Sequence, residues 1–275
     1  TRLKASWQTD YRAFKNRRLD ETQYAYIWVD GVHFNIRLED DRLCALVVLG
    51  VRADGTKELL ALEDGYRESS ESWSAVLRSL KQRGMNTPRL AIGDGALGFW
   101  KAIRNVFPET REQRCWVHKI ANVLDKLPKR LQGRAKEHLH EIMRAETADV
   151  ADAEMKRFKK EYDAKYPKAV KALMKDQDAL LAFFDFPAEH WHHLRTTNAI
   201  ESTFATVKLR TRVTKGAGNR KAALMMAYKL MEAASARWRA IRGRELVPSV
   251  VAGAVYKDGL PVPENETNTE EVAAA

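Results

Sequence analysis

Cysteine is scarce in this chain, and long apolar segments are missing. Its 275 residues include two cysteines, Cys44 and Cys115, so no disulfide framework is implied and a reducing cytoplasm is the expected compartment. No apolar run reaches the ~18 residues that a membrane-spanning helix needs. The N-terminus has no apolar stretch suited to a secretory signal. It also lacks an initiator methionine, which points to a fragment of a longer protein.

Acidic residues are outnumbered as well. The sequence has 47 Lys and Arg against 37 Asp and Glu, a formal net charge of +10 and a pI near 9.5. This surplus favours a polyanionic partner, because each phosphate that a basic side chain neutralises releases condensed counterions. Charge alone does not identify nucleic acid, since ribosome-associated and merely soluble proteins can be basic too. With 45% apolar residues, the chain can bury one large core or two smaller ones.

The residue patterns predict a mixed α/β fold. Three runs rich in apolar, aromatic and β-branched residues, at 24–34, 43–51 and 57–65, are joined by short turns, which predicts an antiparallel meander. The apolar spacing then becomes helical at 69–84. A strand, a helix, a fifth strand and another helix are expected at 88–95, 96–108, 111–118 and 119–128. This order predicts that the sheet continues with parallel strands.

The second half of the chain is predicted to be helical. From residue 128 to about 187, Lys, Arg, Glu and Ala surround apolar stripes. Two more helices are expected at 196–212 and 223–244. Residues 248–275, rich in Pro, Asn, Glu and Thr at their end, are expected to form a disordered tail. The polar, basic residues 1–23 are interpreted as a linker or the end of a preceding region.

Two aspartates stand where predicted strands end. Asp30 and Asp94 each follow a strand-like segment and precede a glycine. In an α/β sheet such positions carry functional groups, because ligands bind outside the carboxyl ends of the strands. Asp-Gly is also a common turn dipeptide, which would explain either aspartate alone. Two of them, each closing a buried-looking strand, favour a functional pair.

A third acid, Glu201, lies beside the apolar residues of the predicted helix 196–212. An ordinary exposed glutamate would fit this position equally well. The residues that follow are rich in positive charge: Lys208, Arg210, Arg212, Lys215 and Arg220. A carboxylate beside a basic stretch suits a site that cuts phosphodiesters, and hard divalent cations such as Mg²⁺ prefer carboxylate oxygens. Two such ions, roughly 3.5–4 Å apart, can activate an attacking oxygen and stabilise a leaving one.

Four segments in a fixed order resemble a known family. They are "YIWVDG", "AIGDG" followed by "FWKAI", "RCWVHKIANVLDKLP" and "TTNAIESTFATVKLRTR". Together they resemble the Mutator-type insertion-sequence transposases of bacteria. The resemblance implies an RNase H-like mixed sheet formed by residues 24–128 and 195–247, with an all-α insertion at 129–194. It also implies that an N-terminal DNA-binding region usually precedes this core and is absent or truncated here.

The resemblance further implies a chemistry. An Asp-Asp-Glu triad, carried over residue by residue, falls on Asp30, Asp94 and Glu201, which would hold two Mg²⁺ ions, with Mn²⁺ as an alternative. The implied activity is cleavage of double-stranded DNA at transposon ends and strand transfer by transesterification. A homodimer or larger assembly is implied too, with no membrane contact and a place at the bacterial nucleoid. The alternatives are a catalytically silent DNA-binding or assembly module, and an RNase H-fold nuclease that cuts without joining.

The family's Cys-x-x-His signature matches Cys115 and His118. This pair is expected to support the floor of the active site, with His118 near a scissile phosphate. A zinc site is the alternative, but tetrahedral zinc needs a second pair of ligands. Cys44 is too isolated in the sequence to complete a familiar motif, and the remaining source is the cluster His190, His192 and His193.

Two further features are candidate DNA contacts. Trp191 is beside basic residues and is proposed to stack on a DNA base, as an aromatic residue does in related transposases; a Trp packed between helices is the alternative. The Lys- and Arg-bearing stretch 208–220 includes two glycines that would let a loop approach a DNA backbone closely. Its alternative is a solvated charged face.

Overall fold

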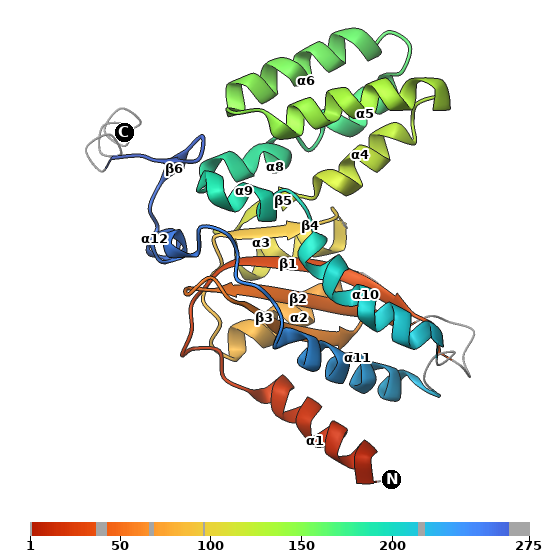
Figure 1. Ribbon diagram of the computed structural model, residues 1–275, viewed down its shortest axis with the longest axis vertical. Coiled ribbons are helices and arrows are strands. Elements are labelled where there is room, and N and C mark those ends of the chain that lie inside the picture. Colours follow the sequence, from red (N-terminus) through yellow and green to blue (C-terminus); the bar gives the residue numbers. More distant parts are fainter. Residues whose placement is uncertain (1, 37–42, 66–68, 96, 214–217, 264–275) are drawn as a thin grey trace.

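The computed structural model describes residues 2–36, 43–65, 69–95, 97–213 and 218–263. Its centre is a five-stranded sheet with the strand order β3-β2-β1-β4-β5 (Figure 1). The strands are β1 (Tyr24–Phe34), β2 (Leu43–Arg52), β3 (Lys57–Asp64), β4 (Leu90–Gly93) and β5 (Arg111–Arg114). β1, β2 and β3 form an antiparallel meander, whereas β4 runs parallel to β1 and β5 parallel to β4. The predicted mixed sheet is thus confirmed.

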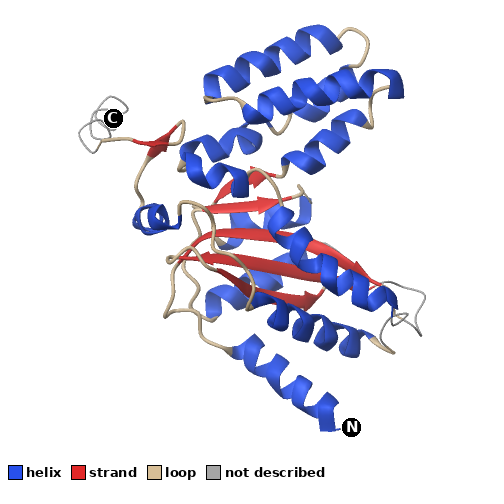
Figure 2. Ribbon diagram, in the orientation of Figure 1, coloured by secondary structure: helices blue, strands red, loops and turns tan. Residues whose placement is uncertain are grey.

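Both faces of the sheet are covered by helices (Figure 2). On one face Ile27 and Val29 belong to an apolar cluster with residues of α2 (Ser70–Gln82) and α3 (Leu97–Val106). On the other face Tyr26 and Trp28 belong to a cluster with residues of α10 (Asn198–Val213) and α11 (Arg220–Ser235). Successive residues of a strand point to opposite faces. The near-continuous apolar runs of β1 and β2 follow from this double burial.

An all-helical segment separates β5 from α10. It comprises α4 (Trp116–Leu124), α5 (Lys129–Arg144), α6 (Ala148–Tyr162), α7 (Pro167–Met174), α8 (Gln177–Leu181), η1 (Ala182–Asp185), η2 (Ala188–His190) and α9 (Trp191–Leu194). Figure 1 shows α4, α5 and α6 standing beyond the edge of the sheet at which β5 lies. The apolar stripes of these helices face one another, and Leu139 of α5 and Phe158 of α6 are fully buried. This agrees with the helical pattern predicted from residue 128.

The fifth strand ends earlier than the sequence predicts. β5 stops at Arg114, and Cys115 is the N-cap residue of α4. His118, predicted at the end of the strand, therefore lies in the first turn of a helix. Apolar residues such as Trp116 and Ile120, both buried, fit a helical spacing as well as a strand, which explains the misplaced boundary.

The two ends of the described chain both pack against the body of the protein. In α1 (Arg2–Asn16), the ring centroid of Phe14 lies 4.8 Å from that of Tyr228 in α11. Residues 247–263 form α12 (Val247–Ala252), β6 (Tyr256–Lys257) and β7 (Leu260–Pro261), where composition predicts disorder. Buried Val250 and a backbone hydrogen bond from Gly259 to Phe184 of 3.0 Å anchor this segment. None of the described helices has the length and apolarity to cross a membrane.

Candidate active site

Asp94 directly follows β4, as the sequence predicts. Asp30, in contrast, does not end its strand: β1 continues to Phe34, and Asp30 lies within it opposite Val47 of β2. In the β1–β4 pair, Trp28 lies opposite Ile92, and continuing this register by two residues brings Asp30 beside Asp94. Side chains two residues apart on a strand point to the same face, so Asp30 points to the face of Trp28 and Asp94 to the face of Ile92. This is the face that α10 covers. Each aspartate is partly exposed, and each interacts with other groups of the protein. The two predicted aspartates therefore occupy adjacent positions on one face of the sheet.

Glu201 reaches the same face from α10. Buried Ile200 and Phe204 pack α10 against the layer that contains Trp28, and Glu201, beside Ile200, is partly exposed. It lies in the first turn of the helix, where the helix dipole favours a carboxylate. The Oγ1 atom of Thr197 donates a hydrogen bond of 3.3 Å to Oε1 of Glu201. This contact orients the carboxylate at the start of α10.

Cys115 links the end of β4 to the start of α10. Its backbone N–H donates a hydrogen bond of 2.8 Å to the carbonyl of Gly93, the residue immediately before Asp94. Its Sγ atom lies 3.4 Å from both the N–H and the hydroxyl of buried Thr197. Burial would raise the pKa of the Cys115 thiol, but the interactions with His118 and Thr197 outweigh burial and lower that pKa. Cys115 and Thr197 thus hold together the two elements that carry Asp94 and Glu201.

The pKa of His118 is raised by the charged groups around it. Its interaction with the Cys115 thiol raises its pKa, burial opposes this, and the charges of Cys115, Asp94 and Glu201 raise it further, to about 9. The imidazole is therefore protonated at neutral pH. Because both carboxylates act on this one ring, the predicted grouping of His118 with Asp94 and Glu201 is consistent with the packing of β4, α4 and α10.

The chemistry of these donors suits a hard divalent cation. Asp30, Asp94 and Glu201 offer carboxylate oxygens, the ligands that Mg²⁺ prefers. All three side chains are partly exposed, so ions and water can reach them from solvent. They come from β1, the end of β4 and α10, elements that the apolar core fixes relative to one another.

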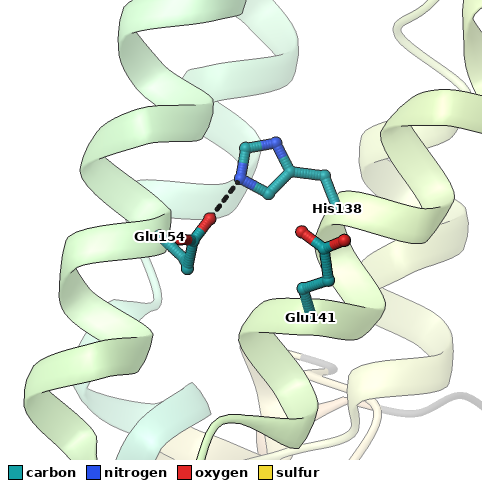
Figure 3. Close-up of side chains that lie close together, drawn as sticks. All are labelled: His138, Glu141 and Glu154. Atoms are coloured by element: carbon teal, nitrogen blue, oxygen red, sulfur yellow. Dashed lines mark hydrogen bonds and ion pairs between the residues drawn. The ribbon is translucent and has the colours of Figure 1, made fainter.

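Among the described residues, the compact group of possible metal ligands lies in the helical insertion and includes none of Asp30, Asp94 and Glu201. Ligand atoms of His138, Glu141 and Glu154 all lie within 4.8 Å of one another. Figure 3 shows Glu154 of α6 facing the His138 ring on α5, with 3.1 Å between Oε2 and Nε2. Glu154 also pairs with Arg157, and Nδ1 of His138 lies 3.9 Å from Glu161. The contacts of His138 link α5 to α6, and none of the contacts in this group involves the elements that carry Asp30, Asp94 and Glu201.

The "HWHH" histidines do not complete a zinc site with Cys115. Nδ1 of His190 bonds to the hydroxyl of Tyr26 at 2.7 Å, and Nε2 bonds to the carbonyl of Gly243 at 2.8 Å. Nε2 of His193 accepts the N–H of Arg242 at 3.0 Å. Within the described residues, no cluster of three or more possible metal ligands includes Cys115.

Trp191 lacks the exposed face that base stacking requires. Its side chain is 9% exposed, and its indole N–H donates to the carbonyl of Phe186 at 2.7 Å. The rings of Phe183 and Phe184 pack against it at centroid distances of 5.3 and 4.9 Å. The prediction that Trp191 contacts DNA is corrected accordingly: the apolar residues of η1 enclose this ring, which the local sequence does not reveal.

The basic residues after Glu201 are only partly described. Lys208 is exposed on α10, as a DNA contact would be. The side chains of Arg210 and Arg212 and the whole of Lys215 lie outside the described residues. Arg220 makes two hydrogen bonds of 3.0 and 2.7 Å to Asp64 on β3, so a carboxylate already neutralises its charge. The DNA-binding role of this stretch stays a prediction.

Sequence reasoning missed two buried cations next to the site. Arg114 is 8% exposed, and its Nη1 atom donates to the carbonyl of Gly95 at 3.3 Å and lies 3.3 Å from Asp176. Lys119 is 1% exposed and pairs with the same Asp176 and with the carbonyl of Ala172. Charged residues are mostly exposed, so their residue type gives no sign that they are buried. Their place in the family segment "RCWVHK" is the one signal in the sequence that could have drawn attention to them.

Comparison with known proteins identifies the family of this chain. Residues 1–241 match the family model described as "Transposase, Mutator family". The chain is 60% identical over 259 residues to the transposase for insertion sequence element IS6120 of Mycolicibacterium smegmatis, covering 94% of this chain and 80% of that protein. It is 46% identical over 274 residues to the transposase for insertion sequence element IST2 of Acidithiobacillus ferrooxidans, covering 99% of this chain and 93% of that protein. The chain therefore belongs to the Mutator family of insertion-sequence transposases, which are DNA-processing enzymes.

Proposed function

We propose that this chain is the catalytic core of a metal-dependent DNA transposase, with Asp30, Asp94 and Glu201 as its active-site acids. It would cleave double-stranded DNA at transposon ends and join the freed 3′-OH to target DNA by transesterification. The observation that carries this proposal is the parallel register of β1 and β4, which supports adjacent positions for Asp30 and Asp94 on the face that α10 covers.

An RNase H-like fold is part of the proposal. It is supported by the strand order β3-β2-β1-β4-β5, with an antiparallel meander followed by parallel strands. The helices between β5 and α10 support the expected insertion before the Glu-bearing helix. The homodimer or larger assembly implied by the resemblance stays a prediction.

The three carboxylates would hold two Mg²⁺ ions, with Mn²⁺ as a substitute. Such ions, when bound, neutralise charge on the phosphodiester and lower the pKa of an attacking water. The chain's own contribution is to hold the carboxylates in place through the Cys115–Thr197 contacts. His118, whose ring lies close enough to Asp94 and Glu201 to respond to their charges, would stand near the phosphodiester, where an imidazole N–H can donate a hydrogen bond to an anionic oxygen.

Strand cleavage and joining on a labelled DNA end test the proposal. The DNA carries the terminal inverted repeat of the element that encodes the chain, and the reaction contains Mg²⁺. Asp94→Asn is expected to lower both activities by at least ~10³-fold, as the loss of a residue in a catalytic unit does. Asp149→Asn removes an exposed carboxylate from the first turn of α6 and should leave both activities within twofold of the parent chain.

The other outcomes separate the two rival functions. Cleavage that depends on Asp94 but yields no joined product would indicate a nuclease of the same fold. DNA binding without any cleavage by the parent chain would indicate a binding or assembly module. Equal cleavage by the parent chain and Asp94→Asn would remove the three acids from the mechanism.

A further inference from the structure

A cavity of about 580 Å³ lies where α4, α5 and the segment leading into α10 meet. Two of the residues on its wall are close in the chain to the candidate active site. Val117 immediately precedes His118, and Asn198 lies one helical turn before Glu201 on the same face of α10. The cavity is therefore next to the groups proposed to act on a phosphodiester.

One wall of the cavity is apolar. It is formed by Val117, Ile120 and Leu124 of α4 together with Met143 of α5. Val117 is 45% exposed, although it stands on a helix whose other face is buried in the core. A concave apolar wall of this kind suits the flat face of an aromatic ligand such as a nucleobase.

The remaining wall is positively charged. Lys136, Arg144 and Arg195 line it, with no carboxylate among the residues around the cavity. Within the part of the chain that the structure describes, none of these three cations has an ion-pair partner. The cavity thus combines an apolar wall with uncompensated positive charge.

A second cavity lined with cations differs in its ion pairs. This cavity, of about 620 Å³ beside α3, β5 and α8, is also lined with arginines. There Arg104 pairs with Glu112 and Arg111 with Asp185, and acidic side chains stand among the cations of the lining. The cavity between α4 and α5 differs from it in having cations and no carboxylate in its lining, which favours an anionic ligand.

Arg195 is a partly buried cation whose hydrogen-bonding capacity is incompletely used. Its guanidinium carbon lies 4.5 Å from the ring centroid of Phe183, and its buried Nε atom has no hydrogen-bond partner among the described groups. Burial, followed by the charge of Arg144, lowers the pKa of Arg195 to about 10. An anion placed between partly buried Arg195 and exposed Arg144 would stabilise both cations.

We propose that this cavity binds one nucleotide of the DNA strand next to the cleavage site, with its base on the apolar wall and its phosphate at Arg144 and Arg195. The proposal rests on the proposed function of the three acids nearby, because it adds the site that holds their substrate strand. A nucleotide offers a flat base and a phosphate as one unit, and the proposed function makes DNA the nucleotide polymer at this place. Lys136, which also lines the cavity, would contact a neighbouring phosphate.

The first test removes two of the positive charges that line the cavity, those of Lys136 and Arg144. Lys136→Gln/Arg144→Gln is compared with Lys129→Gln/Arg130→Gln, which removes two exposed cations from the first turn of the same helix α5, outside the cavity. Fluorescence anisotropy with a labelled duplex that has a single-stranded 3′ extension gives the dissociation constant as a function of KCl concentration, in EDTA. The cavity pair should weaken binding by about tenfold at 0.1 M KCl and lower the salt slope by ~1.4–1.8, whereas the control pair should change the slope by less than ~0.5.

The second test fills the cavity without changing charge. Ala121 is an exposed residue of its wall, and its neighbour Asn122 is exposed outside the cavity. Ala121→Trp should weaken DNA binding at least about fivefold with an unchanged salt slope, because the new ring takes the place of a base. Asn122→Trp should bind as the parent chain does. Circular dichroism melting of each variant verifies that it folds.

The failures of the two proposals can be told apart, because binding in EDTA needs no catalysis. If the cavity variants bind DNA like their controls, the nucleotide site is refuted even when cleavage depends on Asp94, and the cavity then serves another anionic ligand. If cleavage does not depend on Asp94 but the cavity variants still lose DNA binding, the nucleotide site is supported and the three-acid mechanism is not.

Discussion

The guanidinium of Arg114 occupies the space that a β-carbon on Gly95 would need. Such an atom would lie 1.6 Å from Nη1 of Arg114, whose hydrogen bond to the carbonyl of Gly95 spans 3.3 Å. Gly95 also has a φ of +94°, a conformation that L side chains rarely adopt. The turn that directly follows Asp94 thus depends on a glycine and on a buried arginine together.

We expect Gly95→Ala to disturb both stability and catalysis. The strained backbone and the displaced arginine should lower the free energy of unfolding by about 1–3 kcal/mol, measured by urea denaturation. Because the turn carries Asp94, strand cleavage should fall by about tenfold or more. Gly133→Ala is the control: it lies within α5 with no atom within 4 Å of the added carbon, and it should stabilise the chain by ~0.5–1 kcal/mol. Equal losses in both variants would contradict the role of Arg114.

The hydroxyl of Thr197 should matter for catalysis more than for folding. It lies 3.4 Å from the Cys115 sulfur and 3.3 Å from Oε1 of Glu201. Thr197→Val keeps the shape of the side chain but removes this contact, so we expect the cleavage rate to fall about 10–100-fold with unchanged DNA affinity. Thr203→Val removes a hydroxyl that bonds only within α10, to the carbonyl of Ala199, and should cleave at nearly the parent rate. Weaker DNA binding by Thr197→Val would argue against a positioning role.

The sequence predicts those parts of the fold that rest on local periodicity. The apolar runs of β1 and β2 and the spacing of Trp73, Val76, Leu77 and Leu80 in α2 reflect burial that is visible residue by residue. Asp30 and Asp94 could be paired because each follows an apolar run. Their adjacency required the strand order, which the sequence implied only through a family resemblance.

The features that were missed depend on contacts between distant segments. Lys119 is buried because Asp176, 57 residues later, meets it, and no local pattern distinguishes this lysine from an exposed one. Trp191 is enclosed by η1 in the same way. The cavity between α4 and α5 exists only after the insertion has folded against the start of α10. Tertiary packing, not periodicity, decides these outcomes.

Asp176 should be the most sensitive acid of the insertion for stability. Its carboxylate pairs with both Lys119 and Arg114, which are nearly inaccessible to solvent. Asp176→Asn leaves two buried cations without a counter-charge, so we expect a loss of roughly 2–4 kcal/mol in the free energy of unfolding; a fully buried pair would lose more. Urea denaturation measures it. Asp178→Asn, an exposed neighbour in α8, should change stability by less than ~1 kcal/mol. Two equally small effects would show that Lys119 and Arg114 do not need Asp176.

His193 should make stability depend on mildly acidic pH. Burial, followed by the charge of Lys57 and other nearby cations, lowers its pKa from 6.5 to about 4, and its Nε2 atom accepts the N–H of Arg242. Below pH 6.5 the unfolded chain therefore binds a proton that the folded chain refuses. The stabilisation is complete above pH 6.5 and is lost progressively as the pH falls to about 4, by ~1–3 kcal/mol.

Urea denaturation between pH 4 and 8 measures how the free energy of unfolding changes with pH for each protein. His193→Gln should flatten this dependence, whereas the exposed neighbour His192, changed to Gln, should keep it. If the free energy of unfolding changed with pH in the same way for the parent chain and for His193→Gln, the pKa of His193 would be the same in the folded and unfolded chains.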